Sequence, residues 1–369
     1  MISDPPSVKL MFLGDISLND DYNNLYVSGE KPFLAVGHML READLVVGNL
    51  ECFSTGNQGE NVLKEYNLKA NPETLNYLCD LKLGLVGLAN NHAYDNLDSG
   101  FQRTIEFLRD NKIAYIGAAL DGREHIPYIF EAKGIKIAIF NYVAMDTNPR
   151  IPADAKVKLN WFNTDKVTKD IALLRASVDH IVIFPHWGGL MEGSMYPDRE
   201  LLQTAKMLIV AGADLIVGHH SHTIQPYEIY RGKYIFYSLG NFCFSDIVKK
   251  NVRSQSDYGR TRHSVILDIV FSKIGYTVCP KPITNNNCYI VCDSPSGIFN
   301  IPNLSKFRIL YDSRIVWGIY YFYEKNIYKI IRYFFSNQRN PLRQLFSIKP
   351  YLMKKTMTNL LRTIFKTGR

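Results

Sequence analysis

Asparagine, aspartate, glutamate and histidine side chains recur in this chain directly after short apolar segments. In LGLVGLANNHAYD, residues 83 to 95, an apolar run ends abruptly on Asn90, Asn91 and His92. Other apolar runs end in the same way, on Asp15, on Asn49 and Glu51, on His186, and on His220 with His222. Imidazole nitrogens together with carboxylate and amide oxygens are the ligands of borderline divalent metals such as zinc, manganese, iron and nickel. The recurrence predicts one metal site built from several strand ends.

Each of these residues also has a purely structural explanation. A lone histidine after a strand is often a core or capping residue, Asn90 suits a left-handed turn, and Asp15 suits the N-cap of a helix. Repetition favours the shared site, because every strand end would otherwise need its own explanation. The spacing of His220 and His222 agrees, since side chains two residues apart on an extended or turning segment can lie on one side.

Alternating strands and helices must position these residues. Apolar, β-branched runs predict strands in residues 8–15, 43–51, 83–92, 136–142, 180–189, 213–222 and 233–242. Segments with helical spacing predict helices in residues 71–81, 99–111, 164–176 and 197–213. The alternation indicates an α/β fold with a layered sheet core. In open α/β sheets the carboxyl ends of the strands form the crevice that binds ligands, so residues far apart in sequence can meet there.

Six motifs in this order, GDISLND, ADLVVGNLE, GLANNHAYD, PHWGG, VGHHSH and YSLGNF, resemble the CapA family of capsule and poly-γ-glutamate synthesis proteins. That family is a branch of the calcineurin-like metallophosphatases, and the resemblance covers residues 8 to 271. It implies a four-layer α/β/β/α sandwich, in which two sheets pack face to face between helices, with a metal centre at the strand ends.

The resemblance also implies a role for each residue. Asp15 resembles the first aspartate ligand, Asn91 the amide ligand, and His186, His220 and His222 the later imidazole ligands. His92 resembles the histidine that stabilises or protonates the leaving group. The implied cofactor is one or two divalent ions, manganese, iron, zinc or nickel, and the implied reaction is hydrolysis by metal-activated water. Asp95 either fixes the tautomer of His92 or serves as a helix cap or turn residue.

Two departures from the metallophosphatase pattern affect the metal centre. The usual Asp-x-His reads Asp15-Ile16-Ser17, so one imidazole is missing, and the usual Gly-Asp reads Gly48-Asn49-Leu50-Glu51. The CapA branch commonly shows this Asn-Leu-Glu form. Glu51 is therefore the predicted substitute ligand.

Four more residues are predicted to contact the substrate around the metal, namely Asn49, Asn90, Trp187 and Asn241. Structural alternatives stay open for two of them. Trp187 could fill the gap between the sheets, and Asn241 could cap its strand.

The charge distribution divides the chain into two parts. Residues 301 to 369 hold 14 Lys and Arg against two acidic residues, a net charge of +12, whereas residues 1 to 300 hold 29 basic and 33 acidic residues, a net charge of −4. We therefore expect a CapA-like metallophosphatase domain in residues 1–300 and a basic, mainly helical extension in residues 301–369. Around residues 320–335 and 353–369, apolar residues fall on one helical face and basic residues on another.

Basic amphipathic helices can lie on an anionic membrane, dock on a protein, or tolerate nucleic acid. Because the body is net acidic and shows no recognition module, nucleic acid is the least favoured partner. The N-terminus lacks the pattern of a secretory signal, and no run of about 18 apolar residues occurs. We expect a cytoplasmic location. Binding of the extension to the membrane would place the protein peripherally at its inner face. Six cysteines in a chain of this length indicate reduced thiols rather than a disulfide scaffold.

Two functions follow as hypotheses. The first is a metal-dependent, phosphoesterase-like hydrolase in capsule or poly-γ-glutamate synthesis, acting on an anionic or polymeric cell-envelope substrate. The second is a non-catalytic metal-binding accessory protein that assists a capsule polymer synthase or exporter, and the missing Asp-x-His imidazole favours it.

Overall fold

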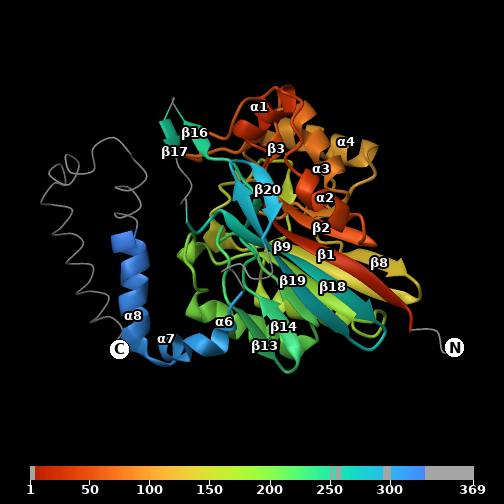
Figure 1. The fold of residues 1–369 in the computed structure, drawn as a ribbon, viewed down its shortest axis with the longest axis vertical. Helices are drawn as coiled ribbons and strands as arrows, with labels where there is room; N and C mark the ends of the chain where they lie inside the picture. Colours follow the sequence, from red (N-terminus) through yellow and green to blue (C-terminus); the bar gives the residue numbers. More distant parts are fainter. Residues whose placement is uncertain (1–4, 250–251, 255–258, 294–300, 329–369) are drawn as a thin grey trace, which may run out of the picture. The chain divides into compact units, whose positions relative to one another are not determined.

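Two main β-sheets form the centre of the protein (Figure 1). The computed structural model describes residues 5–249, 252–254, 259–293 and 301–328. The first sheet has the order β20-β19-β18-β1-β2-β5-β6, with β15 also paired to β1, and the second has the order β13-β14-β12-β11-β9-β8. Within the first sheet β1, β2, β5 and β6 run parallel, and within the second β9, β11, β12 and β14 do.

The strands of the first sheet are β1 (Ser7–Ile16), β2 (Leu45–Leu50), β5 (Leu83–Gly87), β6 (Ala114–Ile116), β15 (Asn241–Cys243), β18 (His263–Ser272), β19 (Tyr276–Asn286) and β20 (Tyr289–Cys292). Those of the second are β8 (Tyr128–Ala132), β9 (Ile135–Val143), β11 (His180–His186), β12 (Leu215–Val217), β13 (Tyr227–Tyr230) and β14 (Lys233–Phe236). Three two-stranded pairs are β3 (Phe53–Ser54) with β4 (Lys69–Ala70), β7 (Ala118–Ala119) with β10 (Lys158–Leu159), and β16 (Ile247–Lys249) with β17 (Val252–Ser254).

The two sheets pack face to face through one apolar cluster. Alternate residues of β1, including Leu10 and Phe12, meet alternate residues of β11, including Val182 and Phe184. The rings of Phe12 and Phe184 have centroids 5.9 Å apart. Burial of this layer removes a continuous apolar surface from water, which is the dominant stabilising contribution to such a sandwich.

Helices cover the outer faces of both sheets. A second cluster joins β1 and β2 to the N-terminal helices α1 (Asp21–Val27), α2 (Leu34–Leu40), α3 (Tyr77–Asp80) and α4 (Leu97–Asp110), which Figure 1 draws in red and orange. On the second sheet, Tyr142 of β9 donates a hydrogen bond to Asp170 of α5 (Thr164–Leu174) at 2.8 Å, and Lys206 of α6 (Arg199–Ala211) pairs with Glu228 of β13 at 2.9 Å. The predicted four-layer α/β/β/α sandwich is confirmed.

Local sequence explains where these helices begin and end. Asn163 and Asp198 are the N-caps of α5 and α6, because their side-chain oxygens accept backbone N–H groups of Lys166 and Glu200. Gly212 ends α6 with a left-handed φ of 116°. The predicted helix over residues 71–81 is instead a 3-10 segment, Pro72–Asn76, followed by the single turn of α3.

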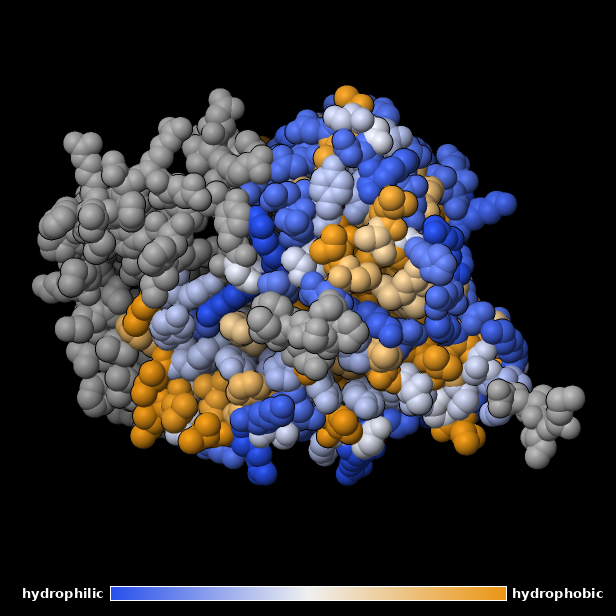
Figure 2. All heavy atoms as spheres, in the orientation of Figure 1, coloured by the Kyte–Doolittle hydropathy of each residue, from blue (hydrophilic) through white to orange (hydrophobic). Residues whose placement is uncertain are grey.

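The chain divides into two compact units, residues 1–301 and 302–369. The described part of the second unit holds a 3-10 turn (Leu304–Phe307), α7 (Arg308–Asp312), α8 (Arg314–Phe322) and a π-helical turn (Tyr323–Tyr328). Apolar side chains of this unit face solvent, as Figure 2 shows for one face: Ile309, Ile315 and Ile319 are 75%, 76% and 57% exposed. Helical structure over residues 320–328 agrees with the predicted amphipathic segment. The remainder of that segment and the predicted helix over 353–369 lie outside the described residues.

Membrane-spanning helices are absent from the described residues, since none of their helices has both the length and the apolar content that a bilayer crossing requires. All six cysteines are unpaired, as expected for reduced thiols.

Asp214, next to β12, yields a prediction about stability. Its carboxylate accepts hydrogen bonds from Arg175 at 2.6 Å, Lys233 at 2.7 Å and the Ile181 backbone N–H at 2.9 Å. Burial would raise the pKa of Asp214, but these partners lower it below its usual value. We expect Asp214→Asn to reduce the free energy of unfolding at pH 7 by about 2 kcal/mol.

The pH dependence of that effect follows from the lowered pKa. The stabilising contribution is complete above the unfolded-state pKa of about 4 and is lost as the pH falls through the lower folded-state value. Thermal melts of both proteins at pH 7 and at pH 3 should therefore show a difference that shrinks at the lower pH. A difference that does not change with pH would contradict this account of Asp214.

Candidate metal centre

The polar residues at the strand ends meet at one edge of the two sheets. Asp15, near the end of β1, lies opposite Asn49 of β2 on one side and Asn241 of β15 on the other. His186 ends β11 in the second sheet and forms a bridge with His219, which follows β12. The parallel strands of both sheets thus bring residues from the whole first unit to one place.

Asp15 is fully buried and is held from several directions. Its Oδ1 accepts a hydrogen bond from Asn49 Nδ2 at 2.8 Å and lies 3.1 Å from His219 Nδ1. Its Oδ2 accepts from the His220 backbone N–H at 3.3 Å and lies 3.6 Å from His222 Nδ1. Both carboxylate oxygens therefore face the imidazoles that follow β12.

Glu51 occupies the middle of the cluster. Its backbone N–H donates to Ile16 O at 2.9 Å, which places the residue beside the end of β1. Its side chain is fully buried, and Oε1 lies 3.7 Å from His186 Nε2 and 3.8 Å from both His92 Nε2 and His222 Nε2. Within the described chain neither carboxylate oxygen of Glu51 has a hydrogen-bond donor.

His220 and His222, two of the three histidines after β12, lie in a strained turn rather than on a strand. His220 and His222 have φ values of 96° and 59°, in the left-handed region that residues with a Cβ rarely adopt. Such conformations persist where the surrounding structure fixes them, often at functional sites. This turn directs the rings of His220 and His222 into the cluster, and His220 Nδ1 lies 3.0 Å from His186 Nε2.

Asn91 and His92 follow β5 and face the same cluster. Asn91 Oδ1 lies 2.9 Å from His186 Nε2. His92 Nδ1 lies 2.5 Å from Asp95 Oδ2 and 3.0 Å from Lys64 Nζ. A lysine ammonium can only donate a hydrogen bond and a carboxylate can only accept one, so His92 Nδ1 cannot bond to both. The shorter contact indicates that Nδ1 carries a proton and donates it in a hydrogen bond to Asp95 Oδ2. His92 Nε2 is then the nitrogen turned toward Glu51.

Lys64 has two other acceptors for its protons. It donates to Asn91 O at 2.8 Å and pairs with Asp95 Oδ1 at 2.9 Å, and only 9% of its side chain is exposed. Asp95 also accepts the Leu68 backbone N–H at 2.7 Å. The structure thus shows both interpretations of Asp95 at once, because its carboxylate contacts the ring of His92 while its backbone N–H closes a turn on His92 O at 3.1 Å.

Burial acts on the pKa of five side chains in the cluster. Burial and the charge of Asp15 raise the pKa of Glu51 well above its usual range. Burial would also raise the pKa of Asp15, but His219 and the other neighbours lower it. Burial lowers the pKa of His220 to about 4, and burial together with the charge of His220 lowers the pKa of His186 well below its usual value. Burial likewise lowers the pKa of His92, against the opposing charge of Asp95.

These residues fit a divalent metal. Candidate ligand atoms of Glu51, His220 and His222 lie within 4.8 Å of one another. Neutral imidazoles and a carboxylate are the forms that bind such metals, and His220 Nε2 has no hydrogen-bond partner among the described residues, as is true of both Glu51 oxygens. Asp15, Asn91 and His186 surround this set, so the structure brings together all six predicted ligands.

The predicted substrate contacts are placed differently. Asn49 is fully buried, and its side-chain Nδ2 donates a hydrogen bond to Asp15 Oδ1 and lies 3.2 Å from His186 Nδ1. Asn241 Oδ1 lies 2.9 Å from His222 Nδ1. These two amides therefore position candidate ligands, because they point at the ligands and not into open space.

Asn90 and Trp187 also have structural contacts. Asn90 donates to Leu50 O at 2.8 Å and accepts the His92 N–H at 3.0 Å, which shapes the turn. Trp187 is 1% exposed and donates its indole N–H to Tyr237 O at 3.1 Å. Its ring packs against Phe162 and Tyr237 and lines a second cavity, so stacking of Trp187 on substrate stays a prediction.

Sequence reasoning missed two residues of the site. His219 stands in the same VGHHSH segment as His220 and could have been found by its position after the strand, whereas Lys64 lies in a loop without any motif. Ser17 stands where the usual motif has a histidine, and its hydroxyl donates a hydrogen bond to Asn19 Oδ1 at 2.7 Å. The imidazole of His219 instead lies beside Asp15, at 3.1 Å.

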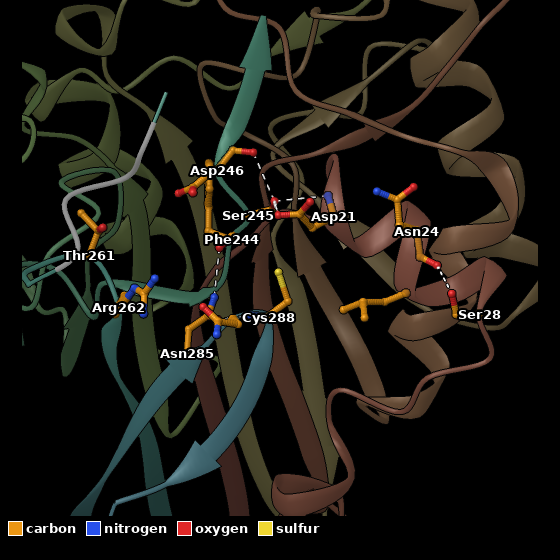
Figure 3. A pocket seen from close by; sticks show the side chains of 12 residues that line it. Asp21, Asn24, Ser28, Phe244, Ser245, Asp246, Thr261, Arg262, Asn285 and Cys288 are labelled. Atoms are coloured by element: carbon orange, nitrogen blue, oxygen red, sulfur yellow. Dashed lines mark hydrogen bonds between the residues drawn. The ribbon is translucent and has the colours of Figure 1, made fainter. Parts of the chain in front are cut away.

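A polar cavity of about 370 Å³ opens beside the centre (Figure 3). Phe244 connects the two, because it lines the cavity and its ring centroid lies 5.1 Å from that of His222. Acidic, amide, hydroxyl and guanidinium side chains surround the cavity, including Asp21, Asp246, Asn24, Asn285, Ser245, Thr261 and Arg262. Asn285 donates to Phe244 O at 3.0 Å and Ser245 donates to Asp21 Oδ2 at 3.1 Å, which fixes two of the walls.

Comparison with known proteins gives a consistent set of relatives. The family model described as "Bacterial capsule synthesis protein PGA_cap" matches residues 9–246. The "PGA biosynthesis protein CapA" of Bacillus subtilis is 30% identical over 280 residues, which cover 72% of this chain and 68% of that protein. The "Capsule biosynthesis protein CapA" of Bacillus anthracis is 28% identical over 263 residues, 69% of this chain and 63% of that protein. The matched region thus spans about two thirds of each relative's length.

Among solved structures, the NAD nucleotidase of Haemophilus influenzae aligns with 79% of this chain and 54% of its own, at 15% identity and a TM-score of 0.44.

Proposed function

This chain belongs to the PGA_cap family of bacterial capsule synthesis proteins, and we propose that it is a metal-dependent, phosphoesterase-like hydrolase that acts in the synthesis of a capsule or poly-γ-glutamate polymer. The observation that carries the proposal is the meeting of Glu51, His220 and His222, with ligand atoms within 4.8 Å, around a carboxylate that has no donor in the described chain. A buried carboxylate in that situation requires a proton or a cation.

In this proposal Glu51, His220 and His222 hold the metal, with Asp15, Asn91 and His186 as the remaining ligands for one or two ions. A bound divalent ion lowers the pKa of water and neutralises charge on phosphoryl oxygens. Asn49 and Asn241 orient the ligands, since the amide of Asn49 bonds Asp15 and that of Asn241 contacts His222. The amide of Asn91 adds a ligand oxygen without adding charge, which keeps the centre attractive to an anion.

His92 is the proposed proton donor to the leaving group. Donation requires the imidazolium form of His92, in which Nδ1–H bonds Asp95 and Nε2–H is given to the leaving oxygen. Burial lowers the pKa of His92, and the charge of Asp95 opposes this effect and favours the imidazolium form. Lys64 keeps Asp95 and the Asn91 carbonyl in place. The polar cavity beyond Phe244 accepts the organic part of the substrate in this proposal, because its amide, hydroxyl and charged side chains suit a polar group.

The proposal is tested with the purified full chain and a panel of phosphomonoesters and phosphodiesters, assayed with manganese, zinc, iron and nickel in turn. We expect metal-dependent hydrolysis of at least one ester, abolished by chelator and restored by metal. Absence of hydrolysis with every metal and ester would remove the enzymatic proposal.

A non-catalytic accessory role is the second candidate, and Ser17 favours it, because the usual Asp-x-His imidazole is replaced by a hydroxyl that bonds Asn19. Capsule production in a deletion strain distinguishes the two. Full rescue by a chain carrying His92→Ala and His220→Ala supports the accessory role, whereas failure of that chain to rescue supports the enzyme.

We further propose that the second unit binds an anionic membrane surface at the site of polymer synthesis. The exposed Ile315 and Ile319 on α8 and the net charge of +12 in the sequence of residues 301–369 support this proposal. Docking on a synthase or exporter is the alternative partner for the same surface.

Vesicle binding checks the membrane proposal. The full chain is expected to co-sediment with vesicles containing phosphatidylglycerol and not with phosphatidylcholine alone. Ile315→Ser with Ile319→Ser should weaken this binding severalfold, because apolar area buried in the interface is lost. Ile274→Ser, at a 98% exposed position of the first unit, is the matched control and should bind normally. Equal binding by all three proteins would contradict the membrane role of α8.

A further inference from the structure

Asn141, two residues before the end of β9, places a polar side chain in the apolar layer between the two sheets. It is 2% exposed. Its Oδ1 accepts a hydrogen bond from the Ala89 backbone N–H at 2.7 Å, and its Nδ2 donates to Phe184 O, also at 2.7 Å. One amide therefore bonds the chain leaving β5 in the first sheet and strand β11 in the second.

The two bonded residues precede candidate ligands by the same spacing. Ala89 stands two residues before Asn91, and Phe184 stands two residues before His186. Asn91 Oδ1 and His186 Nε2 lie 2.9 Å apart across the interface between the sheets. The amide of Asn141 thus connects the two strand exits directly behind that contact.

The surrounding backbone is shaped to hold this amide. A Cβ on Gly117 would lie 2.0 Å from Asn141 Oδ1, and one on Gly87 would lie 2.9 Å from Asn141 Cγ. Asn160 donates its side-chain amide to Asn141 O at 2.8 Å, and its own backbone N–H donates to Gly117 O at 2.8 Å. A buried amide that bonds through both its oxygen and its nitrogen favours one arrangement of the elements that it joins.

We propose that Asn141 is a positioning residue that sets the separation of Asn91 and His186, and with it the metal affinity of the centre. The inference rests on the proposed function, since it concerns the same metal site. It assigns to Asn141 an effect on metal binding that a contribution to stability alone does not produce. Neutral residues that orient metal ligands typically change affinity by about 10- to 100-fold when they are replaced.

The variant Asn141→Leu has a similar volume and loses both hydrogen bonds, whereas Asp214→Asn is a destabilised control at the amino end of β12, the end opposite to the candidate ligands. Manganese binding is measured by electron paramagnetic resonance on the full chain, well below the melting temperature of each protein. We expect Asn141→Leu to bind manganese about 10- to 100-fold more weakly than wild type, with an altered spectrum of the bound ion. Asp214→Asn should keep the wild-type affinity and spectrum.

A second measurement tests the arrangement of the candidate ligands in the metal-free protein. In protein labelled with ¹⁵N-histidine, Asn141→Leu should shift the ring resonances of His186 and His220, and Asp214→Asn should leave them in place. Wild-type manganese affinity and wild-type histidine spectra in Asn141→Leu would overturn the inference. If wild type binds none of manganese, zinc, iron and nickel, the proposed function fails, and the histidine spectra alone decide on Asn141. If Asn141→Leu does not fold, the smaller Asn141→Ser takes its place in both measurements.

Discussion

A His92→Gln chain is expected to keep its metal and to lose phosphoester hydrolysis by about 10²- to 10⁴-fold, the usual contribution of a positioned acid or base. The structure gives two reasons. The Nδ1 atom of His92 is taken by Asp95 at 2.5 Å, so its Nε2 is left for proton transfer. Metal retention is expected because Glu51, His220 and His222 already bring their ligand atoms within 4.8 Å without it.

Turnover and metal content are measured on the same preparations of this variant. His125→Gln makes the same substitution at an exposed histidine and should leave both unchanged. Asp95→Asn should lower turnover with the metal retained, since the amide no longer fixes the ring of His92. A His92→Gln chain that hydrolyses esters within threefold of wild type would show that the ring does not take part in proton transfer.

Glu51→Gln is expected to have effects of opposite sign on the metal-free and metal-loaded proteins. In the metal-free protein the Glu51 carboxylate is fully buried with no donor in the described chain, so the neutral amide should increase the free energy of unfolding at pH 7 by about 1–2 kcal/mol. In the presence of manganese the variant should lose the stabilisation that ligand binding gives wild type.

The pH dependence of the metal-free protein checks the sign. Burial and Asp15 raise the folded-state pKa of Glu51 above the ordinary value of 4.5, so the folded state holds this proton more tightly than the unfolded state. Metal-free wild type should therefore lose stability as the pH rises through 4.5 toward the folded-state pKa, and Glu51→Gln should lack that loss.

Thermal melts from pH 4 to pH 8, with chelator and with manganese, measure these effects. Glu106→Gln, at an exposed position of α4, is the control and should follow wild type. If manganese raises the melting temperature of Glu51→Gln as much as that of wild type, Glu51 is not a ligand.

The fold and the ligand set could be predicted because both depend on patterns that a sequence carries. Strand and helix periods gave the layered α/β core, and polar residues after apolar runs marked the strand ends that parallel pairing then brings together. Asp15 and His186 are 171 positions apart in the chain and still converge on the same cluster. The strained turn at His220 and His222 was not predictable, because positive φ is uncommon at any residue other than Gly, even at His, which adopts it more often than most.

Side-chain direction explains most of what the sequence did not reveal. Asn49 and Asn241 were placed at the right edge of the sheet, but period alone does not say that their amides point at Asp15 and His222. Lys64 reaches the centre from an irregular loop, and Asn141 lies near the end of β9 between the two sheets. Neither position carries a residue pattern that distinguishes it from a solvated lysine or a buried strand asparagine.

Metal content tests the central claim most directly. Wild type, His220→Ala and the exposed control His125→Ala are purified without chelator and analysed by elemental mass spectrometry. We expect one or two divalent ions per chain in wild type and in His125→Ala, and a large loss in His220→Ala. Wild type that holds no divalent ion, even after incubation with manganese, zinc, iron and nickel, would contradict the account of these strand ends as a metal centre.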